Sequence, residues 1–372
     1  MRILIALLMM TLTWQFGYCQ EASQQTKTVK PSIGVYYYPW YADEGRWDRV
    51  MRQHLEPRQE PKLGLYKSND PEVIKDHISQ SVRADIDFWA VSWWGPGDFK
   101  DRTFLNDILK HPDASKLKYA ILYETTGRIR RGNYDNLLTD LEYIQQHYFN
   151  DPNYLKINGK PVVFMYLTRV YFRNKGGDAL KKMREKFPNV YLVGDDVFGA
   201  RYQAKWAKNF DAVTSYDVYG QSIGKLGGTQ EAVDHLAKNY TEAKKQANSV
   251  NVAFMPTVAP GYNDTAVRKG HPGRGRYFTD KKDSKPGDIF KAMINQAALP
   301  NLDSRCENIM MVTSFNEWYE DSQIEATTGQ QKPTSKDDSS TGRYYTGSQT
   351  YYDYGYLYLD ILREMKNPDT KQ

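Results

Sequence analysis

Eight short runs of apolar residues, each followed by a stretch with helical spacing, constrain the fold of this chain more than any other feature. The runs cover residues 33–38, 87–93, 119–123, 161–167, 190–194, 212–216, 252–258 and 309–315. Their nearly continuous apolar character is typical of parallel strands that are covered on both faces. The expected helices lie at residues 71–84, 102–110, 134–148, 177–186, 202–208, 229–247, 285–298 and 348–366. This alternation predicts an α/β fold, a single (β/α)8 TIM barrel.

Two long connections follow the seventh and eighth expected strands, at residues 261–284 and 320–347. In a barrel, loops after strands wall the active site; a disordered insertion is the alternative for the second loop. A doubly wound open sheet is the alternative fold. Such a sheet commonly has a glycine-rich phosphate turn after its first strand, where this chain has YYYPWY at residues 36–41.

The N-terminus has the pattern of a secretory signal peptide. Arg2 precedes the apolar residues 3–12, and the small Gly17 lies at a position suited to cleavage after Cys19. We therefore expect an exported protein, either periplasmic or secreted. Lipid attachment at Cys19 is the alternative, which would place the bulky Tyr18 next to the cleavage point.

The expected organisation is a signal peptide at residues 1–19, an N-terminal linker at 20–30 and one catalytic barrel at 31–368. No later stretch is apolar over the roughly 18 residues that a transmembrane helix needs. Loss of the signal peptide would leave Cys306 without a disulfide partner, and we expect it to be a buried structural thiol. We also expect a monomer.

Charge and histidine spacing argue against other classes of function. The formal net charge is +5, and Lys and Arg are interleaved with Asp and Glu, so nucleic-acid binding is not indicated. The six histidines form no pair at the spacing of metal ligands, and we expect no metal or other cofactor. The Gly-x-Ser-x-Gly motif of many serine hydrolases does not occur in the sequence.

The residues that follow the eighth expected strand are acidic and aromatic. The run NEWYE places Glu317 and Glu320 beside Trp318 and Tyr319. A pair of carboxyl groups can break a glycosidic bond, one by protonating the leaving oxygen and one by supporting the anomeric carbon. The aromatic rings would bind the apolar faces of the sugars. Because barrel active sites lie where strands end, this run predicts sugar chemistry with Glu317 and Glu320 as catalytic residues.

Other strand ends and one long loop offer candidate substrate-binding residues, each of which can also be structural. They are Tyr38, Trp94, Glu124, Asp217, Tyr219 and, in the loop at residues 261–284, Arg276. The chain contains 29 Tyr and 8 Trp, and side chains of this kind can both pack against a sugar and hydrogen-bond to it.

Three motifs resemble those of glycoside hydrolase family 99, the endo-α-mannosidases and bacterial endo-α-1,2-mannanases, or a close relative in the 71/99-like superfamily. They are GVYYYPWY at residues 34–41, VSWWGPG at 91–97 and SFNEWYEDSQIE at 314–325. They occur in order at strands one, two and eight, so the resemblance spans the barrel. It implies a retaining, endo-acting enzyme that cleaves internal α-1,2-mannosidic linkages in mannan or high-mannose glycans without a metal.

The resemblance also implies roles for particular residues. Glu317 matches a carboxylate that deprotonates the substrate's own 2-hydroxyl, which then attacks the anomeric carbon to give a 1,2-anhydro sugar. Glu320 matches the acid that protonates the leaving oxygen and later activates water. Trp94 matches a position that favours mannose over glucose one subsite beyond the cleaved residue.

The sequence departs from the family pattern at strand eight. Tyr319 stands where the family has His, and Asp321 and Ser322 stand where it has Gly-Thr. We expect that the missing imidazole removes a hydrogen bond to the sugar and that the charge of Asp321 raises the pKa of its neighbours. Two alternatives therefore stay open: a catalytically silent barrel that binds glycans, and a related glycosidase with another α-glycan specificity.

Overall fold

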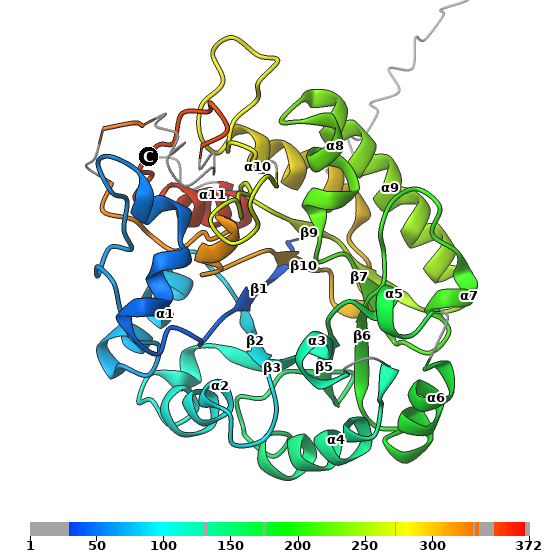
Figure 1. Ribbon diagram of the computed structural model, residues 1–372. Helices are drawn as coiled ribbons and strands as arrows, with labels where there is room; N and C mark the ends of the chain where they lie inside the picture. The colour runs from blue at the N-terminus through cyan, green and yellow to red at the C-terminus, as the bar shows by residue number, and fades with distance from the viewer. Residues whose placement is uncertain are drawn as a thin grey trace, which may run out of the picture.

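A computed structural model describes residues 30–129, 132–173, 176–271, 273–329, 332–334 and 346–368. The expected signal peptide and nearly all of the expected linker lie outside the described residues. In the described part of the chain, strands occupy the centre and helices surround them (Figure 1).

The parallel strands are β1 (Ser32–Tyr37), β2 (Phe88–Trp93), β3 (Lys118–Tyr123), β5 (Lys160–Met165), β6 (Tyr191–Asp195), β7 (Ala212–Thr214), β8 (Ala253–Met255), β9 (Thr257–Val258) and β10 (Ile309–Val312). They follow one another around the sheet in the order β8-β7-β6-β5-β3-β2-β1-β10-β9. All eight expected strands are present. A short strand that the sequence did not predict, β4 (Lys156–Ile157), pairs antiparallel with β5.

The ring closes through the seventh expected strand, which is divided at Pro256 into β8 and β9. β8 pairs with β7, and β9 pairs with β10. Between the two halves, the carbonyl oxygen of Pro256 accepts a hydrogen bond of 2.9 Å from the amide of Met311. The predicted (β/α)8 barrel is therefore confirmed, with one strand interrupted by a proline that cannot donate to the sheet.

Alternation along β1 shows how the barrel is filled. Tyr36 and Tyr38 pack with Phe88 and other inward-facing residues of the barrel interior. Tyr37 points outward, and its hydroxyl lies 2.9 Å from Nδ1 of His77 on α1 (Pro71–Arg83). Tyr38 thus lies inside the barrel just beyond the last residue of β1.

The other α-helices are α2 (Phe99–Arg102), α3 (Thr125–Arg128), α4 (Asn136–His147), α5 (Thr168–Tyr171), α6 (Gly177–Lys186), α7 (Ala204–Ala207), α8 (Gly224–Leu226), α9 (Gln230–Asn248), α10 (Asp288–Ala292) and α11 (Leu357–Lys366). Helices of the 3-10 type span Glu44–Arg49, Met51–His54, Ala114–Lys116, Leu299–Asn301, Ser304–Cys306 and Trp318–Glu320. Helices of the π type span Thr103–Ile108, Tyr219–Ile223 and Met293–Ala298.

Capping residues fix several of these starts. Asp70 accepts a hydrogen bond of 2.9 Å from the amide of Glu72, and Pro71 occupies the first turn of α1, as the sequence predicts. The expected start of the last helix at residue 348 is wrong, because Tyr351 instead exchanges two backbone hydrogen bonds with Thr334, of 2.9 and 2.6 Å. The last helix begins only at Leu357.

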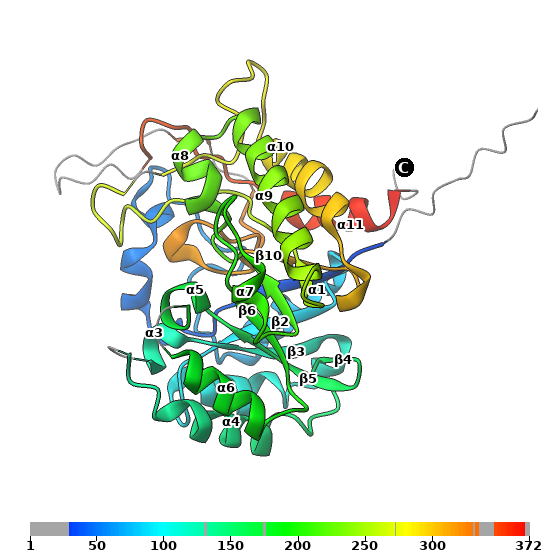
Figure 2. The same cartoon turned by 90° about the vertical axis from the view of Figure 1, so that its right-hand side faces the viewer.

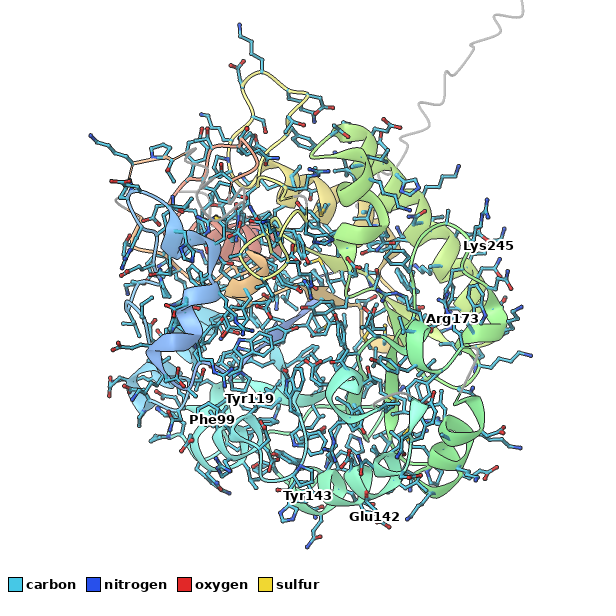
Figure 3. All side chains as sticks on the ribbon, in the orientation of Figure 1. Phe99, Tyr119, Glu142, Tyr143, Arg173 and Lys245 are labelled. Carbon is cyan, nitrogen blue, oxygen red and sulfur yellow. The ribbon has the colours of Figure 1, made fainter. Side chains whose placement is uncertain are left out.

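The two ends of the barrel differ. In Figure 2, α3, α5 and α8, which follow strands, lie toward one side of the barrel with the orange turn after β10, whereas β4 lies on the opposite side. Charged side chains such as Glu142 on α4 and Lys245 on α9 are exposed on the outer helices (Figure 3). Cys306 is fully buried, as predicted, and the described residues include no helix long and apolar enough to span a membrane.

Candidate active site

Glu317 and Glu320 lie on a tight turn directly after β10. The turn is the 3-10 helix Trp318–Glu320, and Glu317 caps it by accepting a hydrogen bond of 2.9 Å from the amide of Tyr319. The amide of Glu317 in turn donates to Oγ of Ser314 at 2.8 Å. Local hydrogen bonds therefore fix the backbone of both predicted catalytic residues.

Asn316 attaches this turn to the first strand of the barrel. Its side chain exchanges two hydrogen bonds with the backbone of Tyr38, of 2.7 and 3.1 Å. The hydroxyl of Tyr41 donates to the carbonyl of Asn316 and accepts from the amide of Trp318, both at 3.0 Å. Four hydrogen bonds thus hold the turn that carries the carboxyl groups against the segment that ends β1 and follows it.

A buried network behind the turn holds Trp318. Its indole N–H donates to Oε2 of Glu325 at 2.7 Å, and the hydroxyl of Tyr66 donates to the same oxygen at 2.9 Å. Nε2 of His77 lies 3.0 Å from the other carboxylate oxygen of Glu325. Trp318 is 1% exposed, so it packs behind the turn and does not face a ligand.

The two glutamates share an electrostatic environment that favours the neutral carboxyl group. Burial raises the pKa of Glu317 well above its usual value, and the negative charge of Glu320 raises it further. Burial raises the pKa of Glu320 to about 7, against the opposing influence of the Arg268 guanidinium. Because each carboxylate disfavours ionisation of the other, the pair holds a proton near neutral pH.

A cavity of about 300 Å³ lies beside this turn at the C-terminal ends of the strands. Its lining is mainly aromatic and charged: Tyr166, Leu167, Arg169, Tyr216, Asp217, Val218, Tyr219, Ala259, Gly261, Tyr262, Arg268, His271, Thr313, Glu320 and Ser322. The side chain of Glu320 is 18% exposed, whereas Glu317 is buried and does not belong to the cavity lining. Glu320 is therefore the carboxyl group that a ligand in this cavity meets first.

Two of the predicted substrate-binding residues line the cavity, and a third lies behind its wall. Asp217 pairs with Arg169 at 3.4 Å, and the ring of Tyr219 stacks on that of Tyr262 with centroids 4.7 Å apart. Tyr38 donates its hydroxyl hydrogen to the hydroxyl of Tyr216 at 2.5 Å. Tyr38 therefore contacts Tyr216, which lines the cavity, but does not line the cavity itself.

Glu124 and Trp94 are joined by one serine. The hydroxyl of Ser92 donates to Oε1 of Glu124 at 2.7 Å and accepts from the indole N–H of Trp94 at 2.9 Å. Burial raises the pKa of Glu124 to about 8, and Glu320 contributes in the same direction. A third carboxyl group near the acid pair is consequently protonated at neutral pH and can donate a hydrogen bond.

Aromatic rings form a surface beside the acid turn. The ring of Trp40 stacks on that of Tyr319 with centroids 5.3 Å apart and planes at 26°, and it lies 6.4 Å from the ring of Trp94. Tyr319 and Trp94 are both only partly buried. Aromatic surfaces of this kind suit the apolar faces of pyranose rings.

Arg276 was expected to bind substrate, but it does not line the cavity. It is 4% exposed and donates to the carbonyl oxygens of Gln323 and Asp321 and to Oδ1 of Asp321, at 2.8, 2.9 and 3.1 Å. Arg52 binds the same Oδ1 at 2.6 Å. The sequence marked Arg276 by its position in a long loop, but the loop folds back and uses this guanidinium to support the turn.

The effect of Asp321 also differs from the expectation, which was that its charge raises the pKa of Glu317 and Glu320. Burial tends to raise the pKa of Asp321, but Arg276 and Arg52 outweigh burial and hold that pKa below its usual value. Its charge is compensated by two guanidinium groups. The pKa of Glu317 is raised instead by burial and by the negative charges of Glu320 and Glu124.

Sequence reasoning did not single out several cavity residues. Tyr166 and Arg169 follow β5, a strand end that offers no acid, and the rule that barrel sites lie at strand ends would have found them. Arg268 and His271 come from the long loop after β9, which the sequence marked only as a wall of the site. Among the described residues, no cluster of three or more His, Cys, Asp or Glu side chains could hold a metal ion.

Cleavage of a glycosidic bond by acid–base chemistry needs one protonated and one ionised carboxyl group at a fixed separation from the sugar. This barrel carries two glutamates with raised pKa values on the turn after its eighth strand, among aromatic rings, and so supplies the carboxyl groups for this chemistry. The fold and the site together define a barrel glycoside hydrolase. Residues 51–352 match the model of glycosyl hydrolase family 99, and the chain belongs to this family.

Similarity to known proteins supports this assignment. The glycoprotein endo-alpha-1,2-mannosidase of Xenopus laevis is 24% identical over 79% of this chain and 69% of its own length. The human glycoprotein endo-alpha-1,2-mannosidase-like protein is 26% identical over 84% of this chain and 72% of its own length. The solved structure of the GH99 endo-alpha-mannosidase from Bacteroides thetaiotaomicron has the same fold, with a TM-score of 0.63, 22% identity, and coverage of 91% of this chain and 96% of that chain.

Proposed function

We propose that this glycoside hydrolase is an endo-acting α-mannosidase that cleaves internal α-1,2-mannosidic linkages of mannan or high-mannose glycans. The observation that carries the proposal is the pair Glu317 and Glu320 on the turn after β10, of which Glu320 lines the cavity. The names of the related mannosidases support the choice of mannose. Trp94, beside the acid turn, supports a preference for mannose over glucose at the neighbouring subsite.

In the first step, we assign Glu317 as the base and Glu320 as the acid. Glu317 takes the proton of the substrate's 2-hydroxyl, and that oxygen attacks the anomeric carbon. The bond to the leaving oxygen breaks as Glu320 gives that oxygen its proton. The exposure of Glu320 to the cavity supports its assignment as the acid. The amide of Tyr319 donates to Glu317 and lowers its pKa, which partly offsets the larger effect of burial.

In the second step, the ionised Glu320 takes a proton from water, whose oxygen opens the 1,2-anhydro ring at the anomeric carbon. Glu317 returns its proton to the 2-oxygen, so both carboxyl groups recover their starting states. Two successive inversions at the anomeric carbon give overall retention of configuration.

The test uses the intact protein with yeast mannan and with α-mannosides that carry either a sugar or an activated aryl leaving group. We expect new reducing ends from mannan with the native protein and none with Glu320→Gln. Glu320→Gln should still release the activated aryl group, which needs no acid, whereas Glu317→Gln should lose both activities. Unchanged mannan turnover by Glu320→Gln would remove this residue as the acid.

Two outcomes would replace the proposed substrate. If mannan binds but stays intact, and no other glycan is cut, the chain is a silent glycan-binding barrel. If other α-glycans are cut while mannan is not, the specificity differs, and Tyr319 in the aromatic surface beside the acid turn would be the first residue to exchange for His.

We further infer that the protein is exported, from Arg2 and the apolar residues 3–12 that follow it. These residues lie outside the described ones. N-terminal sequencing of the mature protein tests this inference: a start at Gln20 supports cleavage after Cys19, whereas a lipid-modified Cys19 would support membrane anchoring. An intact N-terminus would contradict export by this route.

A further inference from the structure

The loop after β9 presents a guanidinium group to the acid turn from a buried anchor. Asp264 is completely buried and accepts a hydrogen bond of 3.0 Å from the hydroxyl of Tyr262. Nδ1 of His271 lies 2.7 Å from its Oδ1, and Nη1 of Arg268 donates to its Oδ2. Arg268 and His271 are therefore both paired with one buried carboxylate at the cavity that they line.

The same loop contacts Glu320 twice. The amide of Asn263 donates to the carbonyl oxygen of Glu320 at 2.7 Å. Nη1 of Arg268 lies 3.3 Å from Oε1 of Glu320. The backbone contact holds the loop against the turn, whereas the side chain of Arg268 is 55% exposed at the cavity that it lines.

Pairing with Arg268 conflicts with the proposed role of Glu320. A general acid must approach the leaving oxygen to about 2.6–3.2 Å, and the substrate reaches Glu320 from the cavity that Arg268 also lines. A guanidinium group that donates to the carboxylate favours its ionised form, whereas the acid must carry a proton. The glycan and Arg268 thus compete for the same carboxyl group.

We propose that Arg268 is a positioning residue that pairs with Glu320 before the substrate binds and retreats to Asp264 alone when a glycan fills the cavity. This inference rests on the proposed role of Glu320 as the acid. Asp264 makes the movement possible, because it keeps the guanidinium group paired after Glu320 is released. Proton uptake by Glu320 then follows substrate binding.

The groups that surround Glu320 explain why one cation can control it. The titratable groups that interact with it are Glu317, Glu124, Asp217, Asp264, Arg268, Tyr166, Tyr216 and Tyr262. Arg268 is the cation of this set that pairs with Glu320, whereas the other basic side chains of the cavity lining, Arg169 and His271, pair with Asp195, Asp217 and Asp264. Departure of the Arg268 charge leaves carboxyl and phenol groups, which raise the pKa of Glu320.

The experiment measures the protonation of Glu320 directly, by carboxyl ¹³C NMR on protein labelled at glutamate, with the signal assigned by its loss in Glu320→Gln. In the free protein, we expect Arg268→Met to raise the pKa of Glu320 by about half a unit, the size typical of a half-exposed ion pair. Arg268→Lys should restore most of the native value. Lys269→Met, which removes an exposed charge one residue along the loop, is the matched control and should change nothing.

The decisive comparison is made with a bound thio-linked α-1,2-mannobioside, which cannot be hydrolysed. We expect the native protein and Arg268→Met to titrate alike in this complex. A difference that persists in the complex would overturn the retreat of Arg268, and identical titrations of the free proteins would overturn its pairing with Glu320. Failure of the thio-mannobioside to bind would instead count against the proposed mannoside substrate, because the comparison of free proteins does not depend on that ligand.

Discussion

Replacement of Asp321 by Asn tests whether the acid turn depends on a buried ionic support. Asp321 is fully buried, and its carboxylate is bound by Arg52 at 2.6 Å and Arg276 at 3.1 Å, which are themselves 1% and 4% exposed. Removal of one partner from a buried ion pair typically costs about 3–5 kcal/mol, because a charge is left without compensation. Both arginines keep carbonyl acceptors, those of Tyr352 and Gln323, so we expect a loss near the lower limit, about 3 kcal/mol.

The assay is urea unfolding followed by tryptophan fluorescence and circular dichroism, which gives the free energy of unfolding of each variant. The matched control is Asp360→Asn, which removes the partly exposed partner of Arg83 and Arg363 and should cost less than about 1 kcal/mol. A loss in Asp321→Asn no larger than that in the control would refute the reasoning.

The pH dependence gives this prediction a second readout. The folded-state pKa of Asp321 is lowered, so its contribution to stability is present above the unfolded value of about 3.9. That contribution is lost as the pH falls through the folded-state pKa. The difference between the native protein and Asp321→Asn should therefore shrink under acidic conditions, and a difference that grows there would contradict the assignment.

Two further predictions concern the residues joined by Ser92. Burial raises the pKa of Glu124 to about 8, so the native protein should lose stability as the pH rises from about 4.3, the unfolded value, through 8. Glu124→Gln should gain stability relative to the native protein between pH 5 and pH 9, measured by urea midpoints; parallel pH profiles would disprove a protonated Glu124. Trp94→Ala should raise KM for mannan roughly tenfold with little change in kcat, because stacking with the sugar is lost, and steady-state kinetics showing an unchanged KM would exclude Trp94 from the substrate path.

The strands were predictable because each lies in a continuous apolar segment, and burial on both faces demands that pattern. Even the strand divided at Pro256 was found, since the proline interrupts hydrogen bonding but not the apolar run. The last helix was predicted to begin too early. The residues from Ser348 to Tyr356 are a mixture of aromatic and polar types, and contacts with distant segments decide their conformation. Tyr351 pairs with the backbone of Thr334, and the amides of Tyr354 and Gly355 donate to the hydroxyl of Thr327.

The acid turn was predictable in position but not in its supports. Local sequence places Glu317 and Glu320 after the eighth strand, and the chemistry of paired carboxyl groups suggests their use. Asp321 is bound by Arg52 and Arg276, which lie 269 and 45 residues away in the sequence, in the 3-10 helix Met51–His54 and in the loop after β9. No periodicity in the sequence encodes such contacts, which is why Arg276 was expected to bind substrate.

The dependence of the acid turn on Arg52, Arg276 and Asn263 limits how this enzyme can be re-engineered or diversify. A segment carrying Glu317 and Glu320, grafted alone onto another barrel, would arrive without its anchoring loops and would leave Asp321 as an unpaired buried charge. An active graft would require the acid turn, the segment that carries Arg52 and the loop that carries Asn263 and Arg276 to be transferred together. Natural variants that exchange Asp321 for a neutral residue should accordingly carry changes at both arginine positions.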